Sequence, residues 1–175
     1  MNIKIINQNK DIARVIINEP KTYNSLSYKN LKDLINIFKK LDKDKKIKVI
    51  ILEGAGKGFS AGHNLKELKD LRKKERYKKL FNLCSKLMLQ IVEGKKPVIA
   101  KVHGAAYAAG CQLVASCDLA YSTKDALFAT PVVPVNFVFN AARICSLFDA
   151  IYSSVLVRDT IHKLPSSIFL TLLTL

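Results

Sequence analysis

Hydrophobic residues recur with two different periods over residues 1–136. Short runs of β-branched residues indicate strands, whereas apolar positions three and four residues apart indicate helices. The pattern predicts strands at 3–6, 12–17, 47–52, 97–102, 119–121 and 126–128, and helices at 27–41, 65–71, 80–91 and from about 110 to 116. Small-residue loops follow two of the strands, at 54–62 and 103–109. Because strands and helices alternate, we expect a layered α/β domain.

The helix predicted at 27–41 shows the helical period most clearly. Leu31, Leu34 and Phe38 recur at a spacing that places them on one face, where they would pack against a sheet. Ser27 stands just before the periodic run and is a good N-cap residue. We therefore expect this helix to begin directly after Ser27.

The pattern changes after about residue 136. Residues 137–175 hold a single lysine, and Phe, Ser, Leu and Thr dominate without clear caps or a period. We divide the chain into a domain at 1–136 and a divergent hydrophobic tail at 137–175. Two interpretations of the tail remain open: a pair of hydrophobic helices, or the product of a shifted reading frame or retained intron. The missing caps favour the second.

Length and charge limit the classes of protein. A chain of 175 residues with 49% hydrophobic and 25% charged residues is long enough for one domain with its own core. The net charge of +15 favours anionic partners such as nucleotide phosphates, RNA or an acidic membrane surface, without choosing among them. The longest clean apolar stretch, 168–175, is too short to span a bilayer.

The four cysteines and three histidines lack the spacings of metal ligands, and no two cysteines form a CxxC pair. We therefore expect neither a metal site nor a disulfide framework, but reduced and mostly buried thiols in an intracellular protein. Residues 1–10 predict a strand, and no secretory signal or mitochondrial presequence is visible there.

Two segments have the composition of backbone ligand sites: GAGKGFSAGHNL at 54–65 and HGAAYAAGCQL at 103–113. Each leaves a predicted buried strand, passes through small residues and enters a helix. Glycine and alanine let a ligand approach the backbone, and the first N–H groups of a helix have no internal partner. Two such N–H groups aimed at one point could stabilise a developing oxyanion.

The strings FSAGHNLKEL at 59–68, KPVIAKVHGAAYAAGCQLVASCDLAYS at 96–122 and LFATP at 127–131 resemble the crotonase (enoyl-CoA hydratase/isomerase) superfamily. The resemblance covers roughly residues 1–133. It implies a crotonase-type spiral of β-β-α units, here incomplete at the C-terminus. It also implies a CoA thioester as substrate or ligand, no covalently bound cofactor, a mitochondrial location, and the homotrimers of intact relatives.

The resemblance assigns roles to particular positions. The family's oxyanion hole consists of two backbone N–H groups, which fall here on His63 and Ala109. The backbone at Ser60, Ala61 and His63 corresponds to the family's CoA-binding loop. Lys66 stands where a family lysine can approach the CoA phosphates.

Three positions depart from the family pattern. Hydratases of the family use two glutamates to place and activate water, and Gln112 and Val132 stand at those positions. A glutamine can hold water but cannot take its proton, so we do not expect efficient hydration. Asn64 replaces a common aspartate, which we expect to weaken polar support of the first loop. Asp118 lies at a strand start, where we expect a structural role.

Three functions remain open. The chain could be an acyl-CoA-binding protein of fatty-acid metabolism without hydratase activity, or an isomerase- or thioesterase-like enzyme that uses the oxyanion hole alone. The basic stretch at 66–79 leaves RNA binding as a third. Tyr77 within it and Phe81 just after it are the only aromatic residues there, so no base-stacking platform is evident. The stretch fits the solvated side of amphipathic helices better.

Overall fold

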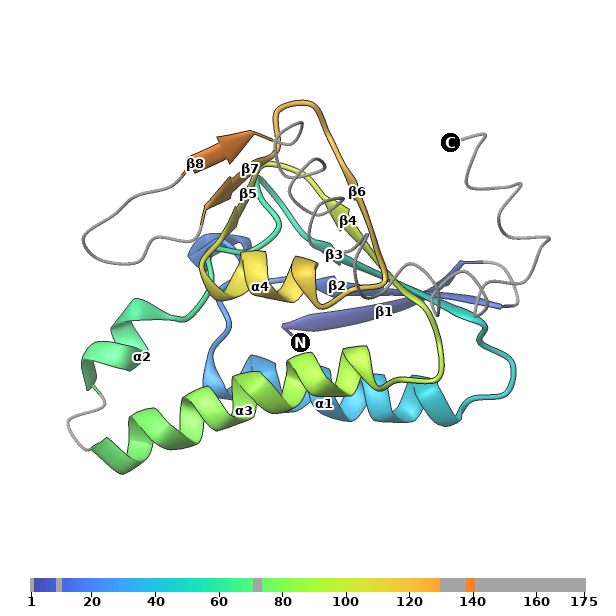
Figure 1. Ribbon diagram of the computed structural model, residues 1–175, viewed down its shortest axis with the longest axis horizontal. Helices are drawn as coiled ribbons and strands as arrows, with labels where there is room; N and C mark the ends of the chain where they lie inside the picture. Colours follow the sequence, from blue (N-terminus) through green and yellow to red (C-terminus); the bar gives the residue numbers. More distant parts are fainter. Residues whose placement is uncertain (1, 9–10, 71–73, 130–137, 141–175) are drawn as a thin grey trace, which may run out of the picture.

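The computed structural model describes residues 2–8, 11–70, 74–129 and 138–140, which form two sheets and their covering helices (Figure 1). The expected α/β class is confirmed. In chain order the elements are β1 (Ile3–Gln8), β2 (Ile12–Ile17), the 3-10 turn η1 (Pro20–Thr22), α1 (Tyr28–Lys43), β3 (Val49–Gly54), α2 (Leu65–Asp70), α3 (Lys74–Val92), β4 (Val98–Val102), β5 (Ala105–Tyr107), α4 (Ala109–Ala115), β6 (Leu119–Ser122), β7 (Leu127–Ala129) and β8 (Val138–Asn140).

The larger sheet has five strands in the order β1-β2-β3-β4-β6. The strands β1 and β2 form the predicted antiparallel hairpin, with Ile3 opposite Ile17, and the remaining strands join in parallel. Alternate residues of β2 are buried, which is the period-2 pattern of a strand packed on one face. The parallel strands β3, β4 and β6 all end at the same edge, so the loops that leave them gather there.

The helices α1 and α3 lie side by side along one side of the larger sheet (Figure 1). In α1 the apolar face of Leu31, Leu34 and Phe38 is buried, as its period predicts. Ser27 is confirmed as the N-cap, because its hydroxyl accepts a hydrogen bond from the Asn30 N–H over 3.2 Å. The long helix α3 buries a second apolar row in the same core: Leu80, Cys84, Leu87 and Ile91.

The smaller sheet, β5-β7-β8, corrects one sequence-based prediction. Residues 103–109 were expected to be a loop throughout, but Ala105–Tyr107 form a strand parallel to Leu127–Ala129. A run of small residues has low strand propensity, so this strand depends on the partner that tertiary structure supplies. The sequence alone could not show that partner.

Other boundaries shift by a few residues or lie outside the described part. The strand predicted at 47–52 spans Val49–Gly54. Leu71, Val132 and most of the predicted tail at 137–175 lie outside the described residues, except that Val138–Asn140 pair with β7 as strand β8. Within the described residues, no helix combines the length and apolar character needed to cross a membrane.

Candidate functional site

The two small-residue segments predicted from the sequence meet through a short stretch of parallel pairing at Ser60 and Ala106. The Ser60 N–H donates to the Ala105 carbonyl over 3.0 Å, and the Tyr107 N–H donates to the Ser60 carbonyl over 2.8 Å. The loop after β3 is therefore fixed against β5, immediately before α4. Residues some forty positions apart in the chain thus share one site.

Close packing between the segments depends on the glycines. A side-chain carbon on Gly110 would lie 2.4 Å from the Ser60 carbonyl oxygen, and one on Gly62 would lie 2.9 Å from the Tyr107 carbonyl oxygen. Gly62 also has φ +84°, a conformation that other residues rarely adopt. Ala108, which precedes α4, has φ 48°, and its N–H donates to the Ala129 carbonyl over 2.8 Å. Substitution at either glycine would force the two segments apart.

The N–H groups of His63 and Ala109 have no hydrogen-bond acceptor among the described residues. Both lie close to Gly62: His63 follows it in the chain, and a side-chain carbon on that glycine would be 3.0 Å from the Ala109 nitrogen. The missing acceptor at Ala109 follows from its place in the first turn of α4. The site therefore presents two backbone donors near Gly62, each free to donate a hydrogen bond to a ligand oxygen.

The His63 side chain is half-buried beside its own backbone donor. Its Nδ1 lies 3.4 Å from the Leu26 carbonyl oxygen, and its ring meets the Phe81 ring edge-on at 5.1 Å between centroids. Burial lowers the pKa of the imidazole below its ordinary value, while the Leu26 carbonyl and the Glu67 carboxylate oppose that shift. Because a carbonyl oxygen can only accept, a hydrogen bond at this contact requires the tautomer with its proton on Nδ1.

Asn64, which stands where the family commonly has aspartate, makes hydrogen bonds of its own at the end of the first loop. Its side-chain oxygen accepts hydrogen bonds from the Lys66 N–H over 3.0 Å and from the Glu67 N–H over 3.2 Å. This is N-cap geometry for α2, for which an amide oxygen serves as well as a carboxylate. Asp118 has the structural role expected of it, since its carboxylate accepts from the Val98 N–H at the start of β4.

The remaining predicted site residues differ in accessibility. Ser60 is 1% exposed, and its hydroxyl donates to the Asn24 carbonyl and accepts from the Gly62 N–H, so it holds the loop together. Ala61 and Lys66 are exposed next to it, and Gln112 is exposed on α4. Val132 lies outside the described residues.

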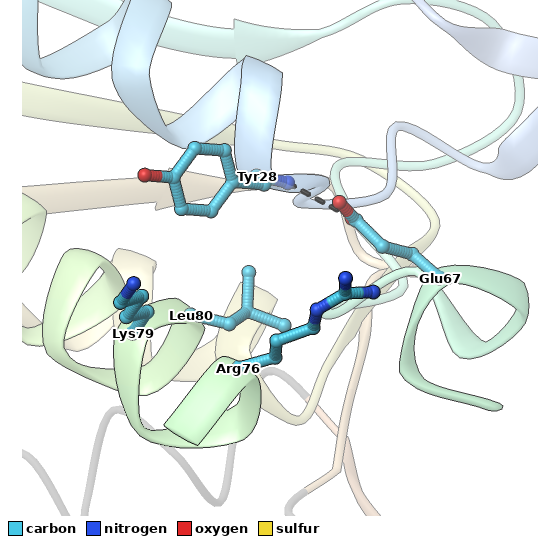
Figure 2. Close-up of a pocket in the computed structure, with 5 residues that line it drawn as sticks. All are labelled: Tyr28, Glu67, Arg76, Lys79 and Leu80. Carbon is cyan, nitrogen blue, oxygen red and sulfur yellow. Dashed lines mark hydrogen bonds between the residues drawn. The ribbon is translucent and has the colours of Figure 1, made fainter. Parts of the chain in front are cut away.

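A pocket of about 190 Å³ near this site was not predictable from the sequence (Figure 2). Its lining comes from three helices: Tyr28, Glu67, Arg76, Lys79 and Leu80. The Tyr28 N–H donates to Glu67 over 2.9 Å and so links the start of α1 to α2. Because these positions belong to separate periodic patterns, no spacing in the sequence marked them as a group.

Among the described residues, no group of three or more His, Cys, Asp or Glu side chains is placed to hold a metal ion. Three cysteines, Cys84, Cys111 and Cys117, are free and buried, as expected for them. The site is therefore built of backbone donors, glycine contacts and one imidazole.

A sequence model described as enoyl-CoA hydratase/isomerase matches residues 7–148, which include the whole of this site. The chain belongs to the enoyl-CoA hydratase/isomerase family. Among curated proteins of this family, mitochondrial enoyl-CoA hydratase domain-containing protein 3 of Xenopus laevis is 42% identical over 77% of this chain and 46% of its own length. Its human counterpart is 43% identical over 71% of this chain and 41% of its own length. The short-chain-enoyl-CoA hydratase of Clostridium acetobutylicum is 34% identical over 76% and 51%.

Solved structures of enoyl-CoA hydratase/isomerase proteins show the same fold. The crystal structure of human enoyl-CoA hydratase domain-containing protein 3 matches with a TM-score of 0.71 and 40% identity, over 75% of this chain and 51% of that one. A Mycobacterium smegmatis enoyl-CoA hydratase matches with a TM-score of 0.72 and 42% identity, over 74% and 50%. The chain spans about half the length of the family members it matches.

Proposed function

We propose that this protein binds acyl-CoA thioesters through a backbone oxyanion hole formed by the N–H groups of His63 and Ala109. The observation that supports this most directly is that both donors lack an acceptor among the described residues, while Gly62 brings them close together. A thioester carbonyl oxygen placed between them would satisfy both. Membership of the enoyl-CoA hydratase/isomerase family makes a CoA thioester the natural ligand.

Two backbone donors stabilise the negative charge that develops on a thioester carbonyl oxygen during reaction more than they stabilise the neutral carbonyl. As electron density shifts onto the carbonyl oxygen, each N–H interaction strengthens, and loss of one such donor typically costs about 3–4 kcal/mol of transition-state stabilisation. Because the donors are main-chain groups, Ala109 can serve where the family commonly has glycine. The proposed site can polarise a thioester without any ionisable side chain.

The same site lacks the means to hydrate a double bond. Hydration needs a group that takes a proton from water, and Gln112 cannot do so. Val132, at the second glutamate position, has no proton-accepting group either. We therefore propose binding of acyl-CoA in fatty-acid metabolism without efficient hydratase activity.

The CoA moiety would lie along the loop before α2. Ala61 is exposed there, and the backbone of His63 follows directly, so both remain proposed CoA contacts. Lys66 is exposed on the first turn of α2, where its ammonium group can attract a phosphate. Ser60 is proposed to support this loop instead of contacting CoA, because its backbone and hydroxyl already bond within the fold.

Location and assembly are proposed from relatives. Several similar proteins are named as mitochondrial, so we propose a mitochondrial location for this protein as well. The crotonase resemblance implies homotrimers for intact relatives, of which this chain spans about half the length. Analytical ultracentrifugation of the 175-residue chain would test its assembly directly.

Calorimetry with a non-hydrolysable thioether analogue of an acyl-CoA tests the proposed site. Ala109→Pro removes the N–H at the first position of α4, where proline is tolerated better than elsewhere in a helix. We expect it to weaken analogue binding by about tenfold or more, which is about 1.4 kcal/mol. His63→Ala is the matched control, because it keeps the backbone donor and removes only the imidazole. If Ala109→Pro folds normally by circular dichroism and binds as tightly as the unchanged chain, the proposed oxyanion hole is wrong.

A further inference from the structure

The pocket beside the proposed thioester site has a charged rim and an apolar floor. In Figure 2, Arg76, Lys79 and Leu80 rise from α3, while Tyr28 and Glu67 face them from the start of α1 and from α2. Leu80 is 1% exposed and closes the bottom of the pocket, whereas Arg76 and Lys79 are exposed at its edge. A ligand here would place an apolar body inward and a polar group near the rim.

Neither cation at the rim has a carboxylate partner in the part of the chain that the structure describes. Within the described residues, no ion pair joins Arg76 or Lys79 to an acidic side chain within 4.0 Å. Lysine and arginine at a pocket edge attract anions, and arginine binds a carboxylate through two parallel hydrogen bonds. The Arg76 guanidinium and the Lys79 ammonium group can therefore both bind an anionic group of a ligand.

Glu67, the acidic side chain among the described residues that line the pocket, already accepts a hydrogen bond. Glu67 accepts the Tyr28 N–H over 2.9 Å, and this bond holds its carboxylate against the first turn of α1. There the positive end of the helix dipole partly compensates its charge. Two unpaired cations against one compensated carboxylate leave the pocket with a net attraction for anions.

The volume limits what can bind. Sites for drug-sized ligands enclose about 300–1,000 Å³, so a pocket of about 190 Å³ accepts a smaller molecule or the end of a longer one. The Tyr28 ring and Leu80 give that molecule an apolar surface on two sides. We propose that this pocket is a subsite for a carboxylate on a short apolar body.

The subsite is separate from the proposed oxyanion hole but adjacent to it. Phe81 follows Leu80 in α3, and its ring contacts the His63 imidazole. Glu67 lines the pocket and also acts electrostatically on His63. The pocket is thus linked to the His63 side chain through Glu67, which lines it, and through Phe81, the neighbour of Leu80 in α3. The carboxylate could belong to a free small molecule or to the far end of an acyl chain.

Titration calorimetry with hexanoate tests the subsite on the complete chain. Hexanol is the uncharged probe of the same chain length, and salt at about 0.15 M screens general attraction to the basic surface. Arg76→Gln/Lys79→Gln removes the two rim charges. Lys78→Gln/Lys86→Gln is the matched control, because it removes two exposed charges from the same helix outside the pocket. We expect the first pair to weaken hexanoate binding by about tenfold or more and the second to leave it nearly unchanged.

Three results would overturn the proposal: no hexanoate binding by the unchanged chain, equal loss in both variant pairs, or hexanol binding as tight as that of hexanoate.

A second experiment identifies the source of the carboxylate. It compares the binding of adipoyl-CoA with that of hexanoyl-CoA, which differ only in that adipoyl-CoA ends in a carboxylate. This arm rests on the proposed acyl-CoA binding. A preference for adipoyl-CoA that Arg76→Gln/Lys79→Gln abolishes assigns the subsite to an acyl chain, and equal binding of the two esters assigns it to a separate anion. Loss of both esters with hexanoate still bound would refute the proposed function alone.

Discussion

The buried side-chain amide of Asn24 donates a hydrogen bond to the Gly58 carbonyl over 2.8 Å, which ties the loop before α1 to the glycine-rich loop after β3. The same amide donates to the Ala55 carbonyl over 2.7 Å, and its oxygen accepts from the Glu19 N–H over 2.9 Å. Asn24 is fully buried, and its φ of 54° lies in the left-handed region that asparagine tolerates better than most residues. One side chain therefore fixes the loop on which the proposed CoA contacts depend.

Asn24→Ala should destabilise the fold. The change leaves buried backbone groups without partners, and each such group costs roughly 1–3 kcal/mol. We expect a loss of at least about 2 kcal/mol in the free energy of unfolding, measured by urea titration. Asn82→Ala, an exposed position on α3, is the control and should change stability by less than about 0.5 kcal/mol. Equal stability of the two variants would show that the Asn24 bonds do not support the loop.

The buried thiols should resist alkylation in the folded protein. Burial raises the pKa of Cys84 to about 11 and also raises the pKa of Cys111 and Cys117. Since the thiolate is the reactive form, only on the order of one Cys84 thiol in a thousand is ionised near pH 8. We expect peptide mass spectrometry after iodoacetamide treatment to show these three cysteines labelled only after unfolding in urea. Rapid labelling of any of them in native buffer would contradict the described core.

Periodic patterns predicted most elements because helices and strands that pack on one face repeat their apolar residues. The α1 helix, with its Ser27 cap, is the clearest case. Features that depend on distant partners were not predictable in this way. The strand Ala105–Tyr107 exists because Leu127–Ala129 pairs with it, and the pocket at Leu80 exists because three helices meet.

The site was predicted only in part for the same reason. Small residues before a helix indicate free N–H groups, which is what the structure shows at Ala109 among the described residues. Their juxtaposition with His63 depends on the pairing of Ser60 with Ala106, which no local pattern encodes. The role of Asn24 was missed because one asparagine in a loop has no distinguishing spacing.

The unchanged protein should not hydrate crotonyl-CoA. Acid–base catalysis by positioned side chains typically contributes about 10²–10⁴-fold, and the two family positions hold Gln112 and Val132. We expect the absorbance of the enoyl group to fall no faster than in buffer, and Gln112→Glu/Val132→Glu to accelerate its loss. Binding of the thioether analogue, measured on the same samples, separates absent chemistry from absent binding. Robust hydration by the unchanged chain would refute this prediction.

Removal of the His63 imidazole should flatten the pH dependence of stability. Burial lowers the pKa of this group in the folded protein, so the unfolded chain takes up its proton first as the pH falls. Stability due to the neutral imidazole is therefore fully present above the ordinary pKa of about 6.5 and is lost as the pH falls from there through the folded pKa. His63→Asn lacks this linkage. Urea titrations between about pH 5 and pH 8 should show a smaller loss of stability towards acid pH in His63→Asn than in the unchanged protein. The variant should still bind the thioether analogue at pH 8, because the donor at residue 63 is a backbone group. If stability falls equally with pH in His63→Asn and in the unchanged protein, the His63 imidazole does not contribute to the pH dependence of folding.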